Sequence, residues 1–231
     1  LTREYFDWLK ETRGIKYDEE VIITTFAHAS NGGIRINKDA ETSVKGIYAA
    51  GEVTGGMHGA DRIGGLSTAN ALVFGKIAGQ NAALFAKNQT NCNNENIIEL
   101  EINSYIRGIR IPRLPPNLVI ETIRELMWKN GNVVRNNEQL NQALQKVREL
   151  SKDSNEKNNS NREINFYDII KAKNYIKLSS ILFTTMLLRE ESRGSHYRED
   201  YPFQRNTFDK FIVVSEDRNG IIKYKWEAPI N

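Results

Sequence analysis

The chain has 231 residues, of which 39% are apolar, and this is enough for one large domain or two small ones with a packed core. Lysine and arginine exceed aspartate and glutamate by only three, 32 against 29, and the excess is spread along the chain, which excludes a nucleic-acid-binding footprint. The single cysteine, Cys92, excludes an internal disulfide and a cysteine-based zinc site, and no apolar run approaches the roughly 20 residues of a transmembrane helix. We therefore expect a cytoplasmic protein with no metal site, no nucleic-acid partner and no transmembrane segment.

The N-terminal part of the chain predicts one helix and two strands. Residues 4–13 place apolar side chains among charges, which is typical of a short amphipathic helix, and Gly14 ends it. The segment VIITTFAH (21–28) is β-branched and aromatic and predicts a strand. The segment GIYAAGE (46–52) is apolar almost throughout and predicts a second strand that is buried on both faces.

A glycine-rich loop over residues 53–65 leads into a long predicted helix over residues 67–87. Alanine and glycine recur along this helix, and such small side chains allow another backbone to approach it closely. Strand, loop and helix together predict an α/β segment that ends near residue 90.

The rest of the chain predicts a mostly α-helical bundle with a small β tail. Helical spacing of apolar residues recurs in four segments, 98–110, 116–134, 136–152 and 166–193. Residues 153–163 are charged and rich in asparagine, and they predict a solvated loop. The tail reads as a β-hairpin that turns at Asn219-Gly220.

The block from the second strand to the long helix is the part of the sequence that indicates a binding site. Ligands in α/β folds bind where a strand ends and a helix begins, and here Glu52 ends the strand and the helix begins near Ser67. Glu52 can accept hydrogen bonds from hydroxyls, Arg62 offers a planar fork suited to a carboxylate, and His28 and His58 can donate or accept. The pattern alone supports a site for a polyhydroxyl cofactor beside an anionic substrate and an ordinary glycine-rich turn equally well.

Three ordered motifs decide between these two interpretations. The segments HASNGGIRI (28–36), GIYAAGEVTGGMHGADRIGG (46–65) and LVFGKIAG (72–79) closely resemble the flavoprotein subunit of the succinate dehydrogenase/fumarate reductase superfamily. L-aspartate oxidase and adenylylsulfate reductase belong to the same group. The segments MWKNGNVVRNNEQL and LLREESRGSHYREDYP are similar to the helical domain that follows in these subunits.

The resemblance implies an FAD flavoprotein and a domain map. Residues 1–36 would end a capping domain, residues 37–90 would form the C-terminal part of the FAD-binding domain, and residues 91–231 would form the helical C-terminal domain with the terminal hairpin. The sequence begins with Leu1 rather than methionine, and it contains no G-x-G-x-x-G phosphate loop for the ADP half of FAD. We therefore expect the C-terminal portion of a longer protein, inactive when isolated.

The resemblance also assigns roles to five residues. His28, which precedes the Gly32-Gly33 pair, matches the substrate-binding histidine, and Arg62 matches the arginine that binds a substrate carboxylate. Glu52 matches the glutamate that hydrogen-bonds the ribityl portion of FAD. Ser67 and Thr68 match the pair at the helix start whose N–H groups meet the isoalloxazine ring. No metal ligand is implied.

The sequence departs from the family at residues 61 and 68. The asparagine that usually precedes the arginine is Asp61 here, which can pair with Arg62 or favour a substrate carrying an amine. The usual leucine after the serine is Thr68, a change of less weight because the contact runs through the backbone.

The function implied is that of an FAD-dependent oxidoreductase in which hydride passes between flavin and a small carboxylate or dicarboxylate. Two alternatives stay open: an L-aspartate oxidase-like or adenylylsulfate reductase-like enzyme, and a non-catalytic fragment that docks an iron–sulfur electron-transfer subunit. Such a partner would place the cytoplasmic chain at the membrane periphery.

A second pair of polar residues, His196 and Asp200, admits an acid–base interpretation because residues four apart share a helix face. We favour instead a structural connection after the long helix, with its charges in ion pairs.

Overall fold

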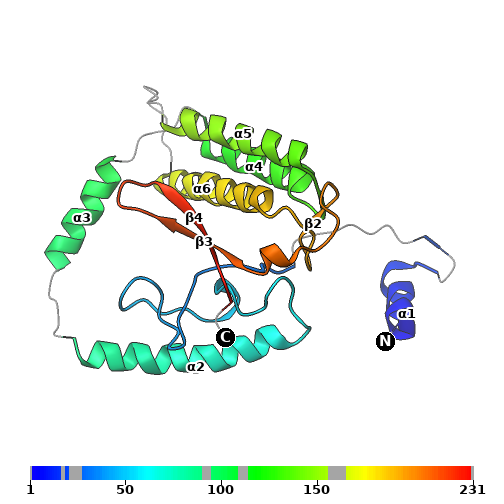
Figure 1. Ribbon diagram of the computed structural model, residues 1–231, viewed down its shortest axis with the longest axis horizontal. Helices are drawn as coiled ribbons and strands as arrows, with labels where there is room; N and C mark the ends of the chain where they lie inside the picture. The colour runs from blue at the N-terminus through cyan, green and yellow to red at the C-terminus, as the bar shows by residue number, and fades with distance from the viewer. Residues whose placement is uncertain are drawn as a thin grey trace. The chain divides into compact units, whose positions relative to one another are not determined.

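A computed structural model of the chain describes residues 2–16, 19–20, 28–89, 95–108, 114–155 and 165–229 (Figure 1). Its contacts divide the chain into two compact units, Leu1–Ser30 and Asn31–Asn231. The elements in chain order are α1 (Thr2–Arg13), η1 (Gly51–Val53), α2 (Leu66–Lys87), α3 (Glu95–Gly108), α4 (Pro116–Asn130), β1 (Val134–Arg135), α5 (Asn137–Asn155), α6 (Phe166–Leu188), β2 (Tyr197–Arg198), η2 (Asn206–Phe208), β3 (Phe211–Glu216) and β4 (Ile222–Glu227).

Helix α1 makes up most of the described residues of the first unit, and it confirms the predicted helix over residues 4–13. The helix ends at Gly14, whose N–H donates to the Lys10 carbonyl oxygen and whose φ of +70° suits glycine. The predicted strand over 21–28 lies outside the described residues except for His28, which is exposed and not in a strand.

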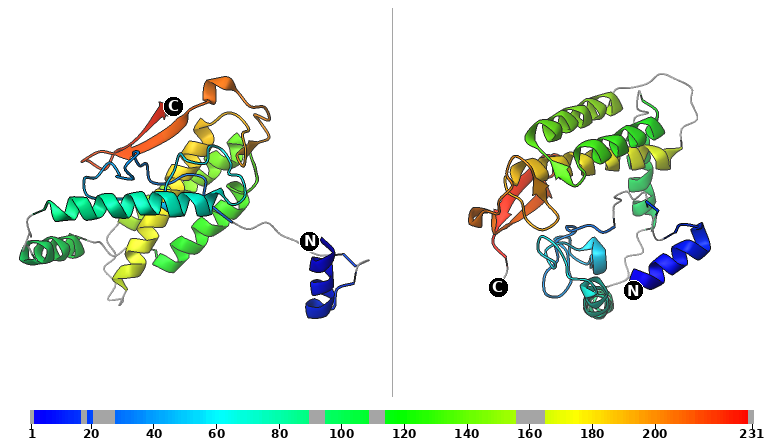
Figure 2. Two further views of the ribbon diagram at one scale, coloured as in Figure 1. Left: turned by 90° about the horizontal axis from the view of Figure 1, so that it is seen from below. Right: turned by 90° about the vertical axis from the view of Figure 1, so that its right-hand side faces the viewer.

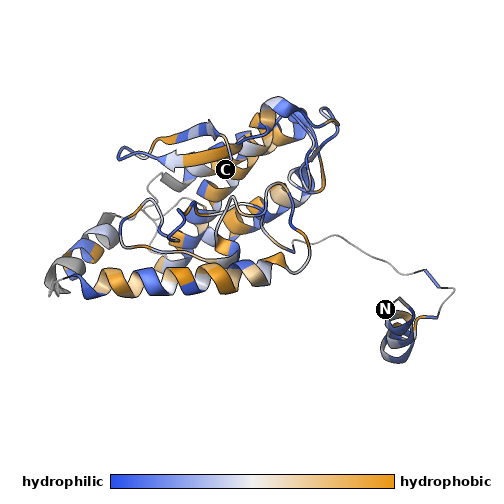
Figure 3. Ribbon diagram, turned by 60° about the horizontal axis from the view of Figure 1, so that its bottom comes forward, coloured by the Kyte–Doolittle hydropathy of each residue, from blue (hydrophilic) through white to orange (hydrophobic). Residues whose placement is uncertain are grey.

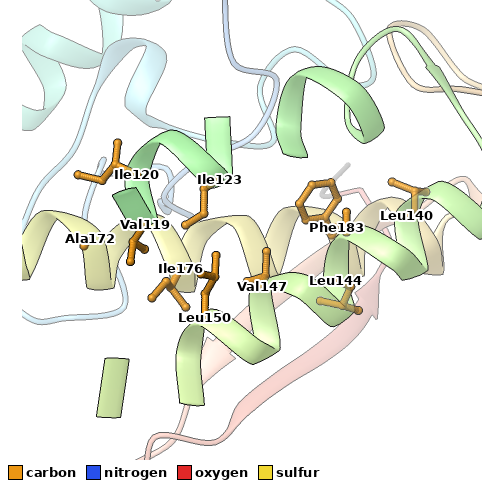
Figure 4. Close-up of a cluster of buried hydrophobic side chains, with 11 residues drawn as sticks. Val119, Ile120, Ile123, Leu140, Leu144, Val147, Leu150, Ala172, Ile176 and Phe183 are labelled. Carbon is orange, nitrogen blue, oxygen red and sulfur yellow. The ribbon is translucent and has the colours of Figure 1, made fainter. Parts of the chain in front are cut away.

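Helices α4, α5 and α6 pack side by side in the second unit and form its core (Figure 2). The helical spacing of apolar residues predicted over 136–152 is confirmed, because Leu140, Leu144, Val147 and Leu150 of α5 are all buried. They pack against Val119, Ile120 and Ile123 of α4 and against Ala172, Ile176 and Phe183 of α6 (Figure 4). Burial of these apolar side chains is the main force that holds the bundle together.

The predicted C-terminal hairpin is also confirmed. Strands β3 and β4 pair antiparallel, with Val213 opposite Lys225, and Gly220 takes the φ of +77° that the turn requires. A short parallel pair, β1 with β2, joins the segment before α5 to the segment after α6. The loop predicted over 153–163 differs at its start, because α5 continues to Asn155, and residues 156–163 lie outside the described residues.

The predicted strand over 46–52 is wrong as a regular element. Tyr48 makes one isolated antiparallel bridge with Glu41, and the chain then enters the single turn η1. Residues 48–50 are half-buried rather than buried on both faces. A strand needs a hydrogen-bonded neighbour along its length, and the described part of the chain provides one only at this bridge. The α/β layout predicted for this region is therefore a loop-and-helix layout.

Helix α2 confirms the long helix predicted over 67–87 and begins one residue earlier. Apolar residues recur along its whole length (Figure 3), and several of them are exposed, namely Leu66, Leu72, Val73 and Leu84. No helix within the described residues is both long enough and apolar enough to cross a membrane.

Candidate functional site

The loop that precedes α2 is fixed by a close crossing of two glycine-containing segments. Ile34 donates from its N–H to the Val53 carbonyl oxygen at 2.8 Å, and Gly55 donates to the Ile34 carbonyl oxygen at 3.0 Å. A Cβ on Gly33 would lie 2.2 Å from the Val53 oxygen, and one on Gly55 would lie 2.6 Å from the Gly33 nitrogen. Only glycine fits at these two positions, so the crossing determines where the loop begins.

Glu52 lies in the turn η1 at this crossing. Gly51 is buried with a φ of +83°, and its carbonyl oxygen accepts hydrogen bonds from the Thr54 N–H at 3.0 Å and the Thr54 hydroxyl at 2.6 Å. The Thr54 side chain is buried, so this hydrogen-bonded side chain holds the turn in one conformation. Glu52 is exposed on this rigid turn, where its carboxylate can meet a ligand hydroxyl.

The amino terminus of α2 has one donor without an acceptor. Gly65 caps the helix in the left-handed conformation and supplies no side-chain cap. The Leu66 N–H donates to the Ile63 oxygen and the Thr68 N–H donates to the Gly65 oxygen, whereas the Ser67 N–H has no acceptor among the described residues. Of the two N–H groups expected to meet a flavin ring, that of Ser67 is therefore open and that of Thr68 is engaged inside the helix turn.

A buried acceptor lies on the same turn of α2. Asn70 is buried, its side-chain nitrogen lies 3.2 Å from Nε2 of His58, and its Oδ1 has no donor among the described residues. An unsatisfied buried acceptor beside an open N–H is what a flat heterocycle with both carbonyl and N–H edges can satisfy. The positive end of the helix dipole also favours negative charge at this point. The residues at the start of α2 therefore fit the ring end of FAD.

Arg62 lies between the glycine crossing and α2 and is half-buried. Its guanidinium makes no hydrogen bond or ion pair with any other residue that the structure describes. The neighbouring Asp61 carboxylate does not pair with this guanidinium. Its Oδ1 accepts a hydrogen bond from the Arg62 backbone N–H at 2.8 Å and lies 3.5 Å from Nδ2 of Asn31. The two-pronged donor of Arg62 is thus available to a carboxylate from outside the chain.

The site residues predicted from the sequence fall in both units. Glu52, Arg62, Ser67 and Thr68 lie within 17 consecutive positions of the second unit, on one turn, one loop and one helix start. His28 lies in the first unit and is exposed.

The sequence did not reveal how the segment after α6 is organised. The fully buried carboxylate of Glu191 accepts from Arg189 Nη1 at 2.6 Å, from Arg193 Nε at 2.9 Å and from the Arg205 backbone N–H at 2.9 Å. Burial alone would raise the pKa of Glu191, but these hydrogen bonds hold it below its usual value. Arg198, also fully buried, donates to both oxygens of Asp200. The favoured interpretation of this segment as an ion-paired connection is confirmed.

His196 belongs to the same network and is not paired with Asp200. Its Nδ1 lies 3.0 Å from Nη1 of Arg135, and its Nε2 lies 3.0 Å from the Arg189 carbonyl oxygen. Since arginine can only donate, Nδ1 accepts and the proton sits on Nε2. Burial, reinforced by nearby arginines, lowers the pKa of His196 to about 4, so the ring is neutral at physiological pH.

Comparisons with known proteins agree with this architecture. The family described as "Fumarate reductase flavoprotein C-term" matches residues 120–227, and the family described as "FAD binding domain" matches residues 5–68. An uncharacterised FAD-dependent oxidoreductase of Methanocaldococcus jannaschii is 36% identical over 207 residues, covering 85% of this chain and 36% of the relative. The L-aspartate oxidase of Saccharolobus solfataricus is 34% identical over 205 residues, covering 88% of this chain and 38% of the relative.

Among solved structures, the quinol fumarate reductase of E. coli matches 99% of this chain and 41% of its own chain, with a TM-score of 0.80 at 21% identity. That likeness shows the fold. The chain spans little more than a third of the length of the two curated relatives. Taken together with the loop, the helix start and the bundle, these matches show that the chain belongs to the FAD-binding flavoprotein family of succinate dehydrogenase and fumarate reductase.

Proposed function

We propose that this chain supplies the carboxylate clamp and part of the flavin site of an FAD-dependent oxidoreductase of the succinate dehydrogenase/fumarate reductase type. The observation that carries the proposal is the half-buried guanidinium of Arg62, which has no partner among the described residues and lies four residues before the open start of α2. A cation held in a loop and left unpaired suits an anionic ligand. In the domain map, residues 1–36, 37–90 and 91–231 are parts of the capping, FAD-binding and helical domains.

The chain's own residues would bind and orient the reactants. Arg62 would hold a substrate carboxylate through two parallel N–H···O bonds. The resemblance to the family gives His28 a substrate-binding role as well. Glu52 would accept a hydrogen bond from a ribityl hydroxyl, and the Ser67 N–H and Thr68 would lie at the edge of the ring. Bound FAD supplies the hydride chemistry. The protein's contribution is therefore geometry and charge at the carbon next to the carboxylate.

A second candidate is oxidation of an amino dicarboxylate, as in L-aspartate oxidase. Asp61 is exposed and carries a negative charge directly beside Arg62. An ammonium group next to the bound carboxylate would interact favourably with that charge, whereas a plain dicarboxylate would not. Turnover of L-aspartate by the flavin-loaded enzyme, measured against turnover of succinate and fumarate, distinguishes the two.

An iron–sulfur electron-transfer subunit is the partner that we propose, and such a subunit would place the cytoplasmic enzyme at the membrane periphery. The supporting observation is the likeness of fold to a chain of quinol fumarate reductase. The alternative of a non-catalytic docking fragment predicts that the chain binds such a subunit without any contribution of Arg62 to turnover.

Replacement of Arg62 by lysine in the flavin-loaded enzyme tests the proposal. Lysine keeps the charge and loses the fork, so one charge-assisted hydrogen bond of roughly 1.5–3 kcal/mol is lost and kcat/KM should fall by about one to two decades. Flavin content should not change, because Arg62 is assigned to the substrate. Arg35→Lys is the matched control, since Arg35 is already paired with Glu227 at 2.6 Å.

Normal kcat/KM in Arg62→Lys would remove Arg62 from the substrate site. Loss of flavin together with activity would instead mean that Arg62 orders the cofactor loop.

A further inference from the structure

The residues immediately before Arg62 contact a turn from the far end of the chain. Ser195, in the Arg193–His196 turn, donates to the Ala60 carbonyl oxygen from its N–H at 3.4 Å and from its hydroxyl at 3.3 Å. The side-chain amide of Asn31 bridges the contact, with Nδ2 3.1 Å from Ser195 Oγ and 3.5 Å from the Ala60 oxygen. The loop and the turn therefore meet through hydrogen bonds although 135 residues separate Ala60 from Ser195.

The Arg193–His196 turn can lie this close to the Ala60 backbone because residue 194 is glycine. Its φ of +56° is in the left-handed region, and a Cβ built there would lie 2.6 Å from the Ala60 oxygen and 2.8 Å from the Ala60 carbonyl carbon. Both contacts are shorter than real Cβ atoms make, and both are with backbone atoms. A side chain at residue 194 would therefore push the Ala60 peptide away from the turn or deform the turn itself.

The turn is the more firmly held of the two partners. Arg193 and His196 exchange backbone hydrogen bonds of 2.8 and 3.0 Å across it. The Arg193 guanidinium is anchored on the buried Glu191, and the His196 ring is held between Arg135 and the Arg189 carbonyl oxygen. The glycine-rich loop over residues 53–65 that carries Arg62, here called the Arg62 loop, is by contrast mostly exposed. A steric conflict at Gly194 would accordingly be relieved mainly by movement of the loop.

We propose that the Arg193–His196 turn positions the Arg62 loop, so that Gly194 and Ser195 are positioning residues of the carboxylate site. The inference rests on the proposed function of Arg62. To lengthen the Cβ–oxygen contact at Gly194 from 2.6 Å to the 3.0–3.4 Å of the tightest real contacts, Ala60 must recede by about half an ångström. A shift of that size in the loop strains one charge-assisted hydrogen bond of the Arg62 fork, and the loss of such a bond is worth about tenfold in affinity. Gly194→Ala should therefore weaken carboxylate binding about tenfold.

The test measures binding of malonate to the flavin-loaded enzyme, because a single carbon between two carboxylates cannot take part in a carbon–carbon desaturation. Gly194→Ala should raise the malonate Kd about tenfold with unchanged flavin content. Ser195→Ala, which removes only the hydroxyl, should raise it about two- to fivefold, and Ser195→Thr should restore the wild-type value. Gly220→Ala is the matched control: its φ is +77°, but a Cβ there meets nothing closer than 3.8 Å, so its Kd should equal that of the wild type.

Arg62→Lys in the same titration separates the two proposals. If Arg62→Lys weakens malonate binding while Gly194→Ala and Ser195→Ala leave it unchanged, the positioning role is wrong and the proposed function stands. If Arg62→Lys binds malonate as the wild type does, the proposed function fails and the positioning role fails with it. If Gly194→Ala does not fold, Ser195→Ala decides, and a wild-type Kd in that variant overturns the inference.

Discussion

Replacement of Glu191 by glutamine should destabilise the second unit strongly. The Glu191 side chain is fully buried and is the shared acceptor of two arginines and of the Arg205 backbone N–H. Glutamine preserves the volume, so the packing stays and the effect isolates the charge. It also replaces an acceptor oxygen with a donor, which must face an arginine N–H or the Arg205 N–H.

The size of the effect follows from burial. Breaking a buried ion pair by removing one partner costs about 3–5 kcal/mol, because the remaining charge is left uncompensated. We expect the lower end, about 3 kcal/mol, since the side chains of Arg189 and Arg193 keep 17% exposure and can recover some hydration. With a urea m-value of about 2 kcal/mol/M, the unfolding midpoint should fall by about 1.5 M.

Urea unfolding followed by far-UV circular dichroism measures this midpoint. Glu149→Gln is the matched control, since Glu149 makes its ion pair with Lys146 on the exposed face of α5. Its midpoint should equal that of the wild type. A Glu191→Gln midpoint that also equals the wild-type value would refute the idea that this buried carboxylate stabilises the segment after α6.

Two further predictions concern stability. Because burial lowers the pKa of His196 to about 4 while an unfolded histidine titrates near 6.5, the unfolded chain binds more protons between these values, so stability falls as pH falls from 6.5 to 4. This effect makes the free energy of unfolding depend on pH by up to about 1.4 kcal/mol per pH unit. In His196→Asn this dependence should be absent when the free energy of unfolding is measured across the same pH range. Phe183→Ala, at a fully buried core position, should cost about 3–5 kcal/mol in urea unfolding, whereas Phe203→Ala, at an exposed position, should leave the midpoint unchanged.

The helical half of the chain could be predicted from the sequence because its determinants are local. Apolar residues at positions 140, 144, 147 and 150 lie on one helix face whatever surrounds the helix, and all four are buried. The hairpin likewise follows from the turn residues Asn219-Gly220, of which Gly220 takes the positive φ.

Elements that depend on partners distant in sequence could not be predicted in the same way. The segment 46–52 has the composition of a buried strand, but a strand forms only beside a strand, and composition does not reveal whether the neighbour is there. The Gly194–Ala60 contact is similar: the sequence predicts a structural connection after the long helix, but not the loop that this connection contacts. Arg62 was singled out by its planar fork in a glycine-rich loop and Asp61 by the resemblance, whereas the hydrogen bond from the Arg62 backbone N–H to Asp61 depends on the fold of the loop.

Aspartate at position 61, where the family usually has asparagine, leaves the geometry of the loop intact and changes only its charge. The hydrogen bond from the Arg62 N–H needs a side-chain oxygen at Oδ1, and asparagine and aspartate both supply one. The added charge is exposed, and two unit charges 4 Å apart in water interact by about 1 kcal/mol, less than the roughly 1.5–3 kcal/mol of a charge-assisted hydrogen bond to Arg62. If Arg62 binds a carboxylate as proposed, we therefore expect Asp61 to change the order of preference among carboxylates: Asp61→Asn in the flavin-loaded enzyme should raise the affinity for dianions about fivefold and lower the affinity for substrates with an ammonium group by a similar factor, as measured by ligand titration.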